Sequence, residues 1–521
     1  RDLIVTGVQT CALPISTTGY QVSIPDALDD YPEIDGVYTA SNPATCTNLT
    51  IADAASVTIN PGKALTVSGT LTVNNDYGLF ILADETGHAS LIHNTNDVPA
   101  IIEMYYTGSA NLGDDKYHLV SIPANVANPT SSIFDGFYLY ELDPTAQNAG
   151  NNNYYGIWNP LGTATTTALS LDKGYMVYYP GESTYITHIE PLHNGDFSCA
   201  VTGHAGTYTF NLVPNPYPSP VNWGEADGWT KSAGIGGTCY VWGSNEGNYE
   251  YIPISGASGI IPVGQAFIIS VYDEASPTLT VKNAARTHSS QAFYKSTQAN
   301  NNQLIVKAVA NNYSDVSRVA FNNEATDGFD LQTDGFKMFG IEKAPQLYTL
   351  SGNEKYSINN LPVFEGQKIV PMNFETQFTG EVTLTFSGIE SFDLSLNFYL
   401  QDLISNKTIN LRQQQVYTFS HNPANPANRF NLVFGGTIGI SETENGNMQM
   451  WISGNTLYLN TPEKAGQSAL LEVFDVSGKM LTSRTLTLNE LTTIELKQKG
   501  LIIVRLTTGE DVWTTKGILT R

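Results

Sequence analysis

Charged side chains are scarce in this chain: Asp, Glu, Lys and Arg together make up 14% of its 521 residues. Cysteine is scarcer still, with four residues, at positions 11, 46, 199 and 239. Cysteines so few and so widely spaced exclude a disulfide-rich scaffold and a cysteine-based zinc site. One bridge, either Cys46–Cys199 or Cys199–Cys239, stays open. No run of eighteen apolar residues occurs, so we expect no transmembrane helix.

Basic residues are also few: 25 Lys and Arg stand against 49 Asp and Glu, for a formal net charge of −24. Such a surface repels phosphate backbones, so we expect no nucleic-acid partner. Carboxylate oxygens are the ligands that Ca²⁺ prefers, and a structural Ca²⁺ ion is left open although no D-x-[DN]-x-[DN]-G loop is present. Otherwise we expect no cofactor and no metal site.

Signatures of catalysis are missing as well. The chain contains no H-E-x-x-H, no G-x-S-x-G and no Walker loop. His188 and His193 are separated by an odd number of residues, which on a strand places them on opposite faces. We therefore interpret them as surface histidines rather than as a pair of metal ligands.

Acidic clusters keep one enzymatic alternative open. Two facing carboxyl groups are what a glycosidase requires. The candidate clusters are Asp26/Asp29/Asp30 and Glu324/Asp327/Asp330. With 49 acidic residues such clusters arise readily by chance, and no nucleophile can be placed beside a base. We predict no catalytic residues and keep a polysaccharide-degrading enzyme as the second alternative.

What the chain does have is typical of exposed sheets. It contains 28 Tyr and 45 Gly, with many Thr and Asn, which suit pleated surfaces and turns. No helical period of any length appears, so we predict an all-β protein. The expected domains are a non-native segment at 1–16, a β-solenoid or meander at 17–98, a duplicated β-sandwich region at 99–292, a β-sandwich at 293–437 and a separate tail at 438–521.

The first two segments differ in character. "VTGVQTCALPIS" at 5–16 resembles a translated sequencing adapter, so residues 1–16 are set aside and the true N-terminus and signal peptide are expected to be lost. Residues 49–81 carry apolar pairs at short, regular steps, each ended by turn residues. That spacing predicts coils of a β-solenoid or a meander, which must stack on a neighbour to bury their apolar faces.

Three sequence blocks recur in the same order about ninety residues apart. "YHLVSIPAN" at 117–125 answers "FNLVPNPYP" at 210–218, and "FYLYELDP" at 137–144 answers "CYVWGSNEG" at 239–247. The third pair begins at 171 and 261 and matches Gly174 with Gly264. We predict two copies of one β unit with the same strand order.

Aromatic side chains crowd both copies. Rings on an exposed sheet or loop stack on sugars or anchor protein partners, whereas buried rings only fill a core. The candidates are Tyr138, Tyr140, Tyr154, Tyr155, Trp158, Tyr175, Tyr178 and Tyr179 in the first copy and Tyr217, Trp223, Trp242, Tyr249 and Tyr251 in the second. A carbohydrate-binding surface protein is therefore the first alternative function.

The tail at 438–521 is nearly neutral, unlike the acidic body, and shows turn signals between six or seven short strands. That number of strands is typical of a small immunoglobulin-like sandwich. Its ordered motifs resemble the type A C-terminal sorting domain of the type IX secretion system. The residues that carry the resemblance are Pro462, Gly466, Asp475, Gly478, Lys479, Gly500, Arg505 and Lys516.

This resemblance implies the route and location of the protein. It implies a Gram-negative bacterium, type IX secretion machinery as partner, and a secreted protein at the outer-membrane cell surface. Text such as "FDLQTDGFK" at 329–337 in the body is similar to that of other secreted surface proteins. We expect a structural or adhesive protein, with a glycan or protein ligand on other cells.

Overall fold

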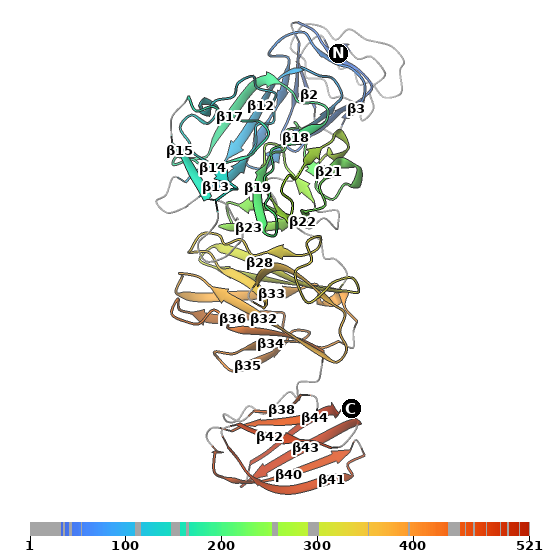
Figure 1. Cartoon of the computed structure of the whole chain (residues 1–521), viewed down its shortest axis with the longest axis vertical. Coiled ribbons are helices and arrows are strands. Elements are labelled where there is room, and N and C mark those ends of the chain that lie inside the picture. Colours follow the sequence, from blue (N-terminus) through green and yellow to red (C-terminus); the bar gives the residue numbers. More distant parts are fainter. Residues whose placement is uncertain are drawn as a thin grey trace, which may run out of the picture. The chain divides into compact units, whose positions relative to one another are not determined.

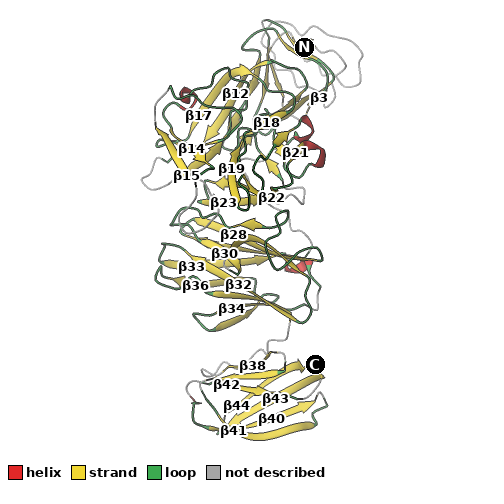
Figure 2. Cartoon of the chain, in the orientation of Figure 1, coloured by secondary structure: helices red, strands yellow, loops and turns green. Residues whose placement is uncertain are grey.

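The described part of the chain folds almost entirely into strands and turns (Figures 1 and 2). The computed structural model describes residues 33–34, 37–40, 44–53, 55–109, 116–146, 157–162, 166–252, 259–289, 302–352, 354–393, 396–435, 449–453, 455–461, 464–475, 477–489, 491–497, 500–509 and 511–519. The helices in these ranges are short 3-10 turns, η1 (Ser131–Phe134), η2 (Ala226–Gly228), η3 (Asn283–Ala285) and η4 (Ile389–Ser391). The all-β prediction is confirmed.

Two compact units make up the chain. The first comprises residues 1–363, 371–391 and 415–429, and the second comprises residues 364–370, 392–414 and 430–521. The solenoid, the duplicated region and most of the third sheet belong to the first unit. The tail belongs to the second.

A three-sided β-solenoid forms the beginning of the described chain. Its sides are three sets of parallel strands, β1-β4-β7, β2-β5-β8 and β3-β6-β11. The bounds are β1 (Glu33–Ile34), β2 (Val37–Ala40), β3 (Ala44–Cys46), β4 (Leu49–Ile51), β5 (Ser56–Ile59), β6 (Ala64–Val67), β7 (Leu71–Val73), β8 (Leu79–Ile81) and β11 (Ser90–His93). A hairpin of β9 (Ala83–Asp84) and β10 (Gly87–His88) interrupts the last coil. Parallel pairing between coils decides for a solenoid over a meander.

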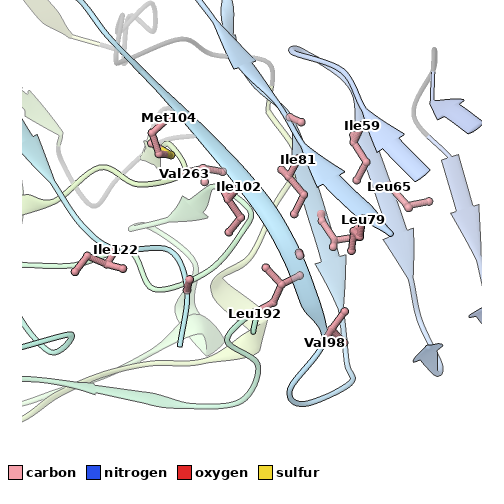
Figure 3. Packing of buried hydrophobic residues seen from close by; sticks show 14 of the residues in the cluster. Ile59, Leu65, Leu79, Ile81, Val98, Ile102, Met104, Ile122, Leu192 and Val263 are labelled. Carbon is pink, nitrogen blue, oxygen red and sulfur yellow. The ribbon is translucent and has the colours of Figure 1, made fainter. Parts of the chain in front are cut away.

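The region that follows the solenoid packs against its last coil. This agrees with the prediction that the coils must stack on a neighbour to bury their apolar faces. Strand β12 (Pro99–Tyr106) pairs in parallel with β8 and, along its other edge, antiparallel with β17 (Thr184–Pro191). Figure 3 shows Ile59 and Ile81 of the coils in the same apolar cluster as Ile102 of β12. All three side chains are at most 1% exposed, so coil and sheet share one core.

The two copies have the same strand order. The first contains β13 (Tyr117–Val120), β14 (Tyr138–Asp143), β15 (Ile157–Gly162) and β16 (Tyr175–Tyr178), and the second contains β19 (Tyr208–Val213), β22 (Ile235–Gly243), β23 (Asn248–Ile252) and β25 (Phe267–Tyr272). The orders are β13-β16-β14-β15 and β19-β25-β22-β23, so in each sheet the fourth strand lies between the first and the second. The predicted agreement in strand order is confirmed.

The flanking strands repeat this agreement. In the first copy β12 pairs with β17, and in the second β18 (Phe197–Cys199) pairs with β26 (Leu279–Val281), in both cases antiparallel. The second copy adds strands β20 (Val221–Asn222), β21 (Trp229–Lys231) and β24 (Ile260–Ile261). The duplication therefore extends from before the first sheet strand to beyond the last.

The two sheets meet through reciprocal contacts. The Gly174 N–H donates to the Leu212 carbonyl at 3.0 Å, and the Ala266 N–H donates to the Leu119 carbonyl at 3.1 Å. A Cβ at Gly174 would overlap the Cβ of Ala266. Small residues at both positions let the backbones approach closely.

The register of the third matched block needs a correction. Val120 pairs with Tyr175, and the corresponding Val213 pairs with Phe267, so the counterpart of Gly174 is Ala266 rather than Gly264. A shift of two residues leaves the same faces of a strand inward, so the apolar pattern could not reveal the error.

A larger sheet follows in the first unit. The strands there follow the order β36-β33-β27-β28-β31-β30-β32. The short strand β29 also pairs with β31 but is not part of this linear order. The bounds are β27 (Gln303–Ala310), β28 (Tyr313–Asn322), β29 (Gly335–Phe336), β30 (Gln346–Ser351), β31 (Glu354–Pro362), β32 (Gln367–Glu375), β33 (Gly380–Ser387) and β36 (Val416–His421). In the second unit β34 (Phe398–Asp402) lies between β35 (Lys407–Asn410) and β37 (Phe430–Gly435).

The tail is a sandwich of a three-stranded sheet, β38-β39-β42, and a four-stranded sheet, β41-β40-β43-β44. The bounds are β38 (Gln449–Ser453), β39 (Thr456–Asn460), β40 (Ser468–Asp475), β41 (Met480–Thr487), β42 (Leu491–Glu495), β43 (Gly500–Thr508) and β44 (Asp511–Leu519). One apolar cluster joins the sheets, with Leu457, Leu471 and Val504 at 0% exposure. This core is the tail's own.

Candidate functional site

The residues predicted to form a sorting motif gather mainly at one end of the four-stranded sheet. Asp475 pairs with Ile502, two positions after Gly500, and Ile502 pairs with Gly517, the neighbour of Lys516. The β40–β41 turn, the start of β43 and the end of β44 therefore lie together. Gly466 is at the opposite end, before β40, and Pro462 lies outside the described residues.

The β40–β41 turn is fixed by Asp475. Its Oδ1 accepts from the N–H of Ser477 at 2.9 Å, from the Oγ of Ser477 at 2.6 Å and from the N–H of Lys479 at 3.0 Å. The Ser477 hydroxyl is the main cause that lowers the pKa of Asp475. Gly478 has φ +82°, which a side chain would strain, and it donates to the Asp475 carbonyl. Aspartate and glycine thus build the turn that exposes Lys479.

The two motif cations on the strands share the outer face of this sheet. Arg505 pairs with Thr514 and Ile503 pairs with Lys516, so Arg505 and Lys516 lie diagonally across β43 and β44. Arg505 donates to Glu472 on β40 at 2.8 Å and 2.7 Å. This contact covers Glu472, and its side chain is 9% exposed.

A second candidate site is a cavity of about 390 Å³ between the two copies. Its lining residues are Glu141, Leu142, Asp143, Pro144, Thr145, Asn159, Lys173, Gly174, Ala200, Thr202, Asn211 and Leu212. Lys173 and Glu141 form an ion pair with 38% and 30% of their side chains exposed. The walls therefore offer charged and polar groups with partial access to solvent.

Hydrogen bonds hold Asn211 in one wall of this cavity. The Asn211 side chain is bound on both sides by the backbone of Thr202: its Oδ1 accepts from the N–H at 2.7 Å, and its Nδ2 donates to the carbonyl at 2.8 Å.

In the corresponding place of the duplication, Ser244 donates to the Tyr117 carbonyl, and Lys116 Nζ donates to Asn245 at 3.0 Å. The β22–β23 turn thus packs against β13, whereas the matching region of the first copy borders a cavity. Sequence reasoning missed this site because its walls come from separate segments.

Most of the aromatic candidates that the structure describes serve the core. All five named in the second copy, and Tyr175 in the first, are buried. The indole N–H of Trp223, for example, donates to the Gly237 carbonyl at 2.7 Å. Tyr138 is 46% exposed, with its ring 5.9 Å from that of Tyr178, and Tyr154 and Tyr155 lie outside the described residues. Rings for stacking on a sugar are thus left only in the first copy among the described candidates.

The structure corrects the histidine prediction and decides the cysteine alternatives that the sequence left open. His188 is 4% exposed and not a surface residue, because it faces inward from β17, whereas His193 lies beyond the end of that strand. Cys46, Cys199 and Cys239 are buried free thiols, so neither of the bridges left open is formed. Cys11 lies outside the described residues.

Of the two acidic clusters proposed from the sequence, the structure describes only the one that contains Asp330. Asp330 shapes its own loop, accepting from the N–H of Thr326 at 2.6 Å and from its hydroxyl at 2.9 Å. The cluster Asp26/Asp29/Asp30 lies outside the described residues, as does the segment 1–16. Within the described ranges, no group of three or more His, Cys, Asp and Glu side chains is arranged to hold a metal ion. Nor does any helix in these ranges have the length and apolar character needed to cross a membrane.

Comparison with known proteins places this all-β chain in a family. The chain belongs to the family described as a domain of unknown function (DUF8693), whose model matches residues 10–253 and 245–434. The match begins within the segment 1–16 and ends just before the tail. No curated protein matches the chain.

Similarity to solved structures is slight. Two fibronectin type III domains of chicken tenascin match with 12% identity and a TM-score of 0.12, over 30% of this chain and 97% of theirs. Beta-glucuronidases of Lactobacillus rhamnosus and Ruminococcus gnavus match with 9% identity and a TM-score of 0.10, over 77% of this chain. The chain spans just under half of the glucuronidases, 46% and 47%. At these TM-scores neither fold nor activity carries over.

Proposed function

We propose that this chain is a secreted structural or adhesive protein of the bacterial cell surface, exported by a type IX secretion system through residues 438–521. The observation that carries the proposal is the tail: a sandwich with its own core that presents Asp475, Gly478, Lys479, Gly500 and Lys516 together at one end. A signal shared by many cargoes needs a fold that is stable apart from the body. The end of the family match at residue 434 supports that separation.

The body has a non-catalytic role in this proposal. Its buried rings fill cores, Asp330 of its described acidic cluster shapes a loop, and its buried thiols have pKa values raised by burial, in the case of Cys46 to about 11. A thiol held neutral in this way is a poor nucleophile. These roles are structural, and they leave the open faces of the sheets for attachment.

Transfer of the tail tests the sorting role. Fusing residues 438–521 to a foreign periplasmic protein, in a host with this secretion system, should bring the fusion to the surface, measured by antibody labelling of intact cells. Lys479→Glu should lower the labelling severalfold, because the charge at the exposed end is reversed. The matched change Arg484→Glu, on an exposed position of β41 outside the motif, should not. Retention of the unchanged fusion in the periplasm would contradict the proposal.

The cavity between the copies favours glycan binding as a second candidate function. Its volume of about 390 Å³ lies in the range of small-ligand sites, and its walls carry Glu141, Asn159 and Lys173. Sugar hydroxyls donate to a carboxylate and accept from an ammonium, and such charge-assisted bonds contribute about 1.5–3 kcal/mol each.

Glycan arrays and calorimetry with the full chain test this binding. Lys173→Met should weaken the affinity for a bound glycan by about tenfold or more, since one charge-assisted bond is lost. Lys307→Met, on an exposed position of β27, should leave it unchanged. An array without any bound glycan, or equal affinities of the two variants, would rule out the cavity as a glycan site.

A further inference from the structure

Lys337 and Asp315 form a charge pair that solvent does not reach. Nζ of Lys337 lies 2.8 Å from Oδ2 of Asp315, and both side chains have 0% exposure. Asp315 belongs to β28, and Lys337 directly follows β29. The ring centres of Phe339 and Tyr251 are 5.7 Å and 5.9 Å from Nζ. The pair thus joins two separate segments inside an aromatic surrounding.

Burial acts on both groups toward their neutral forms. It lowers the pKa of Lys337, against the opposing charges of Asp315 and Glu375. It raises the pKa of Asp315, against Lys337 and the backbone N–H groups of Leu347 and Val316. A neutral amine is a nucleophile and a neutral carboxylic acid can accept it, whereas an ammonium and a carboxylate do not react.

The two oxygens of Asp315 have different partners. Oδ1 accepts from the Val316 N–H at 2.9 Å. Oδ2 accepts from the Leu347 N–H at 2.5 Å and is the oxygen that contacts Lys337. Oδ1 is therefore placed to carry the charge that develops during attack on the carboxyl carbon, and Oδ2 is placed to take a proton from nitrogen.

We propose that Lys337 and Asp315 become joined by an intramolecular isopeptide bond. Nζ of the neutral amine attacks Cγ of the protonated carboxyl group, and the C–N bond forms. A proton passes from nitrogen to Oδ2, the C–Oδ2 bond breaks, and one water molecule leaves. Oδ1 remains as the amide oxygen on the Val316 N–H. The reaction is a condensation without any change of oxidation state, so it needs no further reactant.

The mass of the full-length chain tests this proposal directly. The purified protein, incubated at neutral pH until its mass is constant and then denatured, should weigh one water molecule less than its sequence requires. Proteolysis should release a branched peptide that contains both Lys337 and Asp315. A chain of full mass that yields the two peptides separately would overturn the proposal, and this measurement does not depend on any variant folding.

Two variants locate the bond. Lys337→Met keeps a side chain of similar length without the amine and should restore the full mass, and a persistent loss of water in this variant would also overturn the proposal. Lys464→Met is the matched control, since Lys464 lies 2.6 Å from Asp511 with their side chains 26% and 57% exposed. It should retain the loss of water. A branched peptide joining Lys464 to Asp511 would show that proximity suffices and would refute the argument from burial.

Discussion

A chain that lacks residues 438–521 is expected to fold its body and yet fail to appear on the cell surface. The tail has its own apolar core, with Leu457, Leu471 and Val504 fully buried within it, so its removal exposes no core of the solenoid or of the copies. The motif residues leave with it. Loss of display should therefore be nearly complete, while the thermal unfolding of the body stays as it was.

Surface exposure can be measured by protease accessibility on intact cells of a host that has the secretion system, with cell fractionation to locate the truncated chain. It should accumulate in the periplasm. The full-length chain, expressed at the same level, is the control. Display of the truncated chain equal to that of the control would remove the sorting role, and its degradation would show instead that the body depends on the tail for stability.

Acid is expected to destabilise the body strongly through its buried histidines. His88, His93, His118 and His188 are each at most 5% exposed. Burial is the main cause that lowers the pKa of each to about 4; Arg286 adds to this at His93 and Lys116 at His118, while Asp84 opposes it at His88. In the unfolded chain each pKa returns to about 6.5.

The direction in which stability changes with pH follows from the protons that each state binds. Between pH 6.5 and pH 4 the unfolded chain binds protons that the folded chain does not, so stability is full above about pH 6.5 and falls as the pH falls. Each histidine contributes up to roughly 3 kcal/mol, at about 1.4 kcal/mol per pKa unit. Asp334, whose pKa burial raises to about 7, and Asp315, whose pKa burial also raises, act in the opposite direction, but they are two groups against four.

Differential scanning calorimetry of the full chain from pH 7.5 to pH 4.5 measures this effect. The midpoint of the body should fall steeply below pH 6.5. The tail contains no histidine, so histidine protonation should not move its transition, which is an internal control. His188→Leu should flatten the decline because it removes one of the four groups. An unchanged slope in this variant, or a body midpoint that is constant down to pH 4.5, would contradict the explanation.

The sequence was informative where a local pattern determines the structure. Apolar pairs such as Leu49/Ile51 and Val57/Ile59, separated by turn residues, predicted coils, and the parallel pairs of the structure confirm a solenoid. The ordered blocks of the duplication predicted one strand order, which both sheets have. In the tail, Asp475 and Gly478 are the residue types that a tight turn requires, and they form one.

Prediction from the sequence failed where contacts between distant segments determine which side chains are buried and which lie together. The sequence left open whether Trp223 and Trp242 are exposed for binding or fill a core, because it does not show which face of a strand another sheet covers, and both are buried. The cavity was missed because Lys173 meets Glu141 and the Asn211 wall only after folding. The pair of Lys337 with Asp315 was missed for the same reason: the stretch 329–337 ends on Lys337, but nothing in it shows that Asp315 of β28 is its partner.

Gly174 bonds Leu212, and Ala266 bonds Leu119 in the same way from the other copy. The two copies therefore meet as the subunits of a symmetric dimer do, but within one chain. Each half is the permanent partner of the other, at a fixed local concentration that dilution cannot reduce. A substitution at this contact in one half must be accommodated by a different residue in the other, because the gene encodes each half separately. The halves are thereby free to diverge: one borders a cavity beside the contact, and in the other a packed turn occupies the corresponding position.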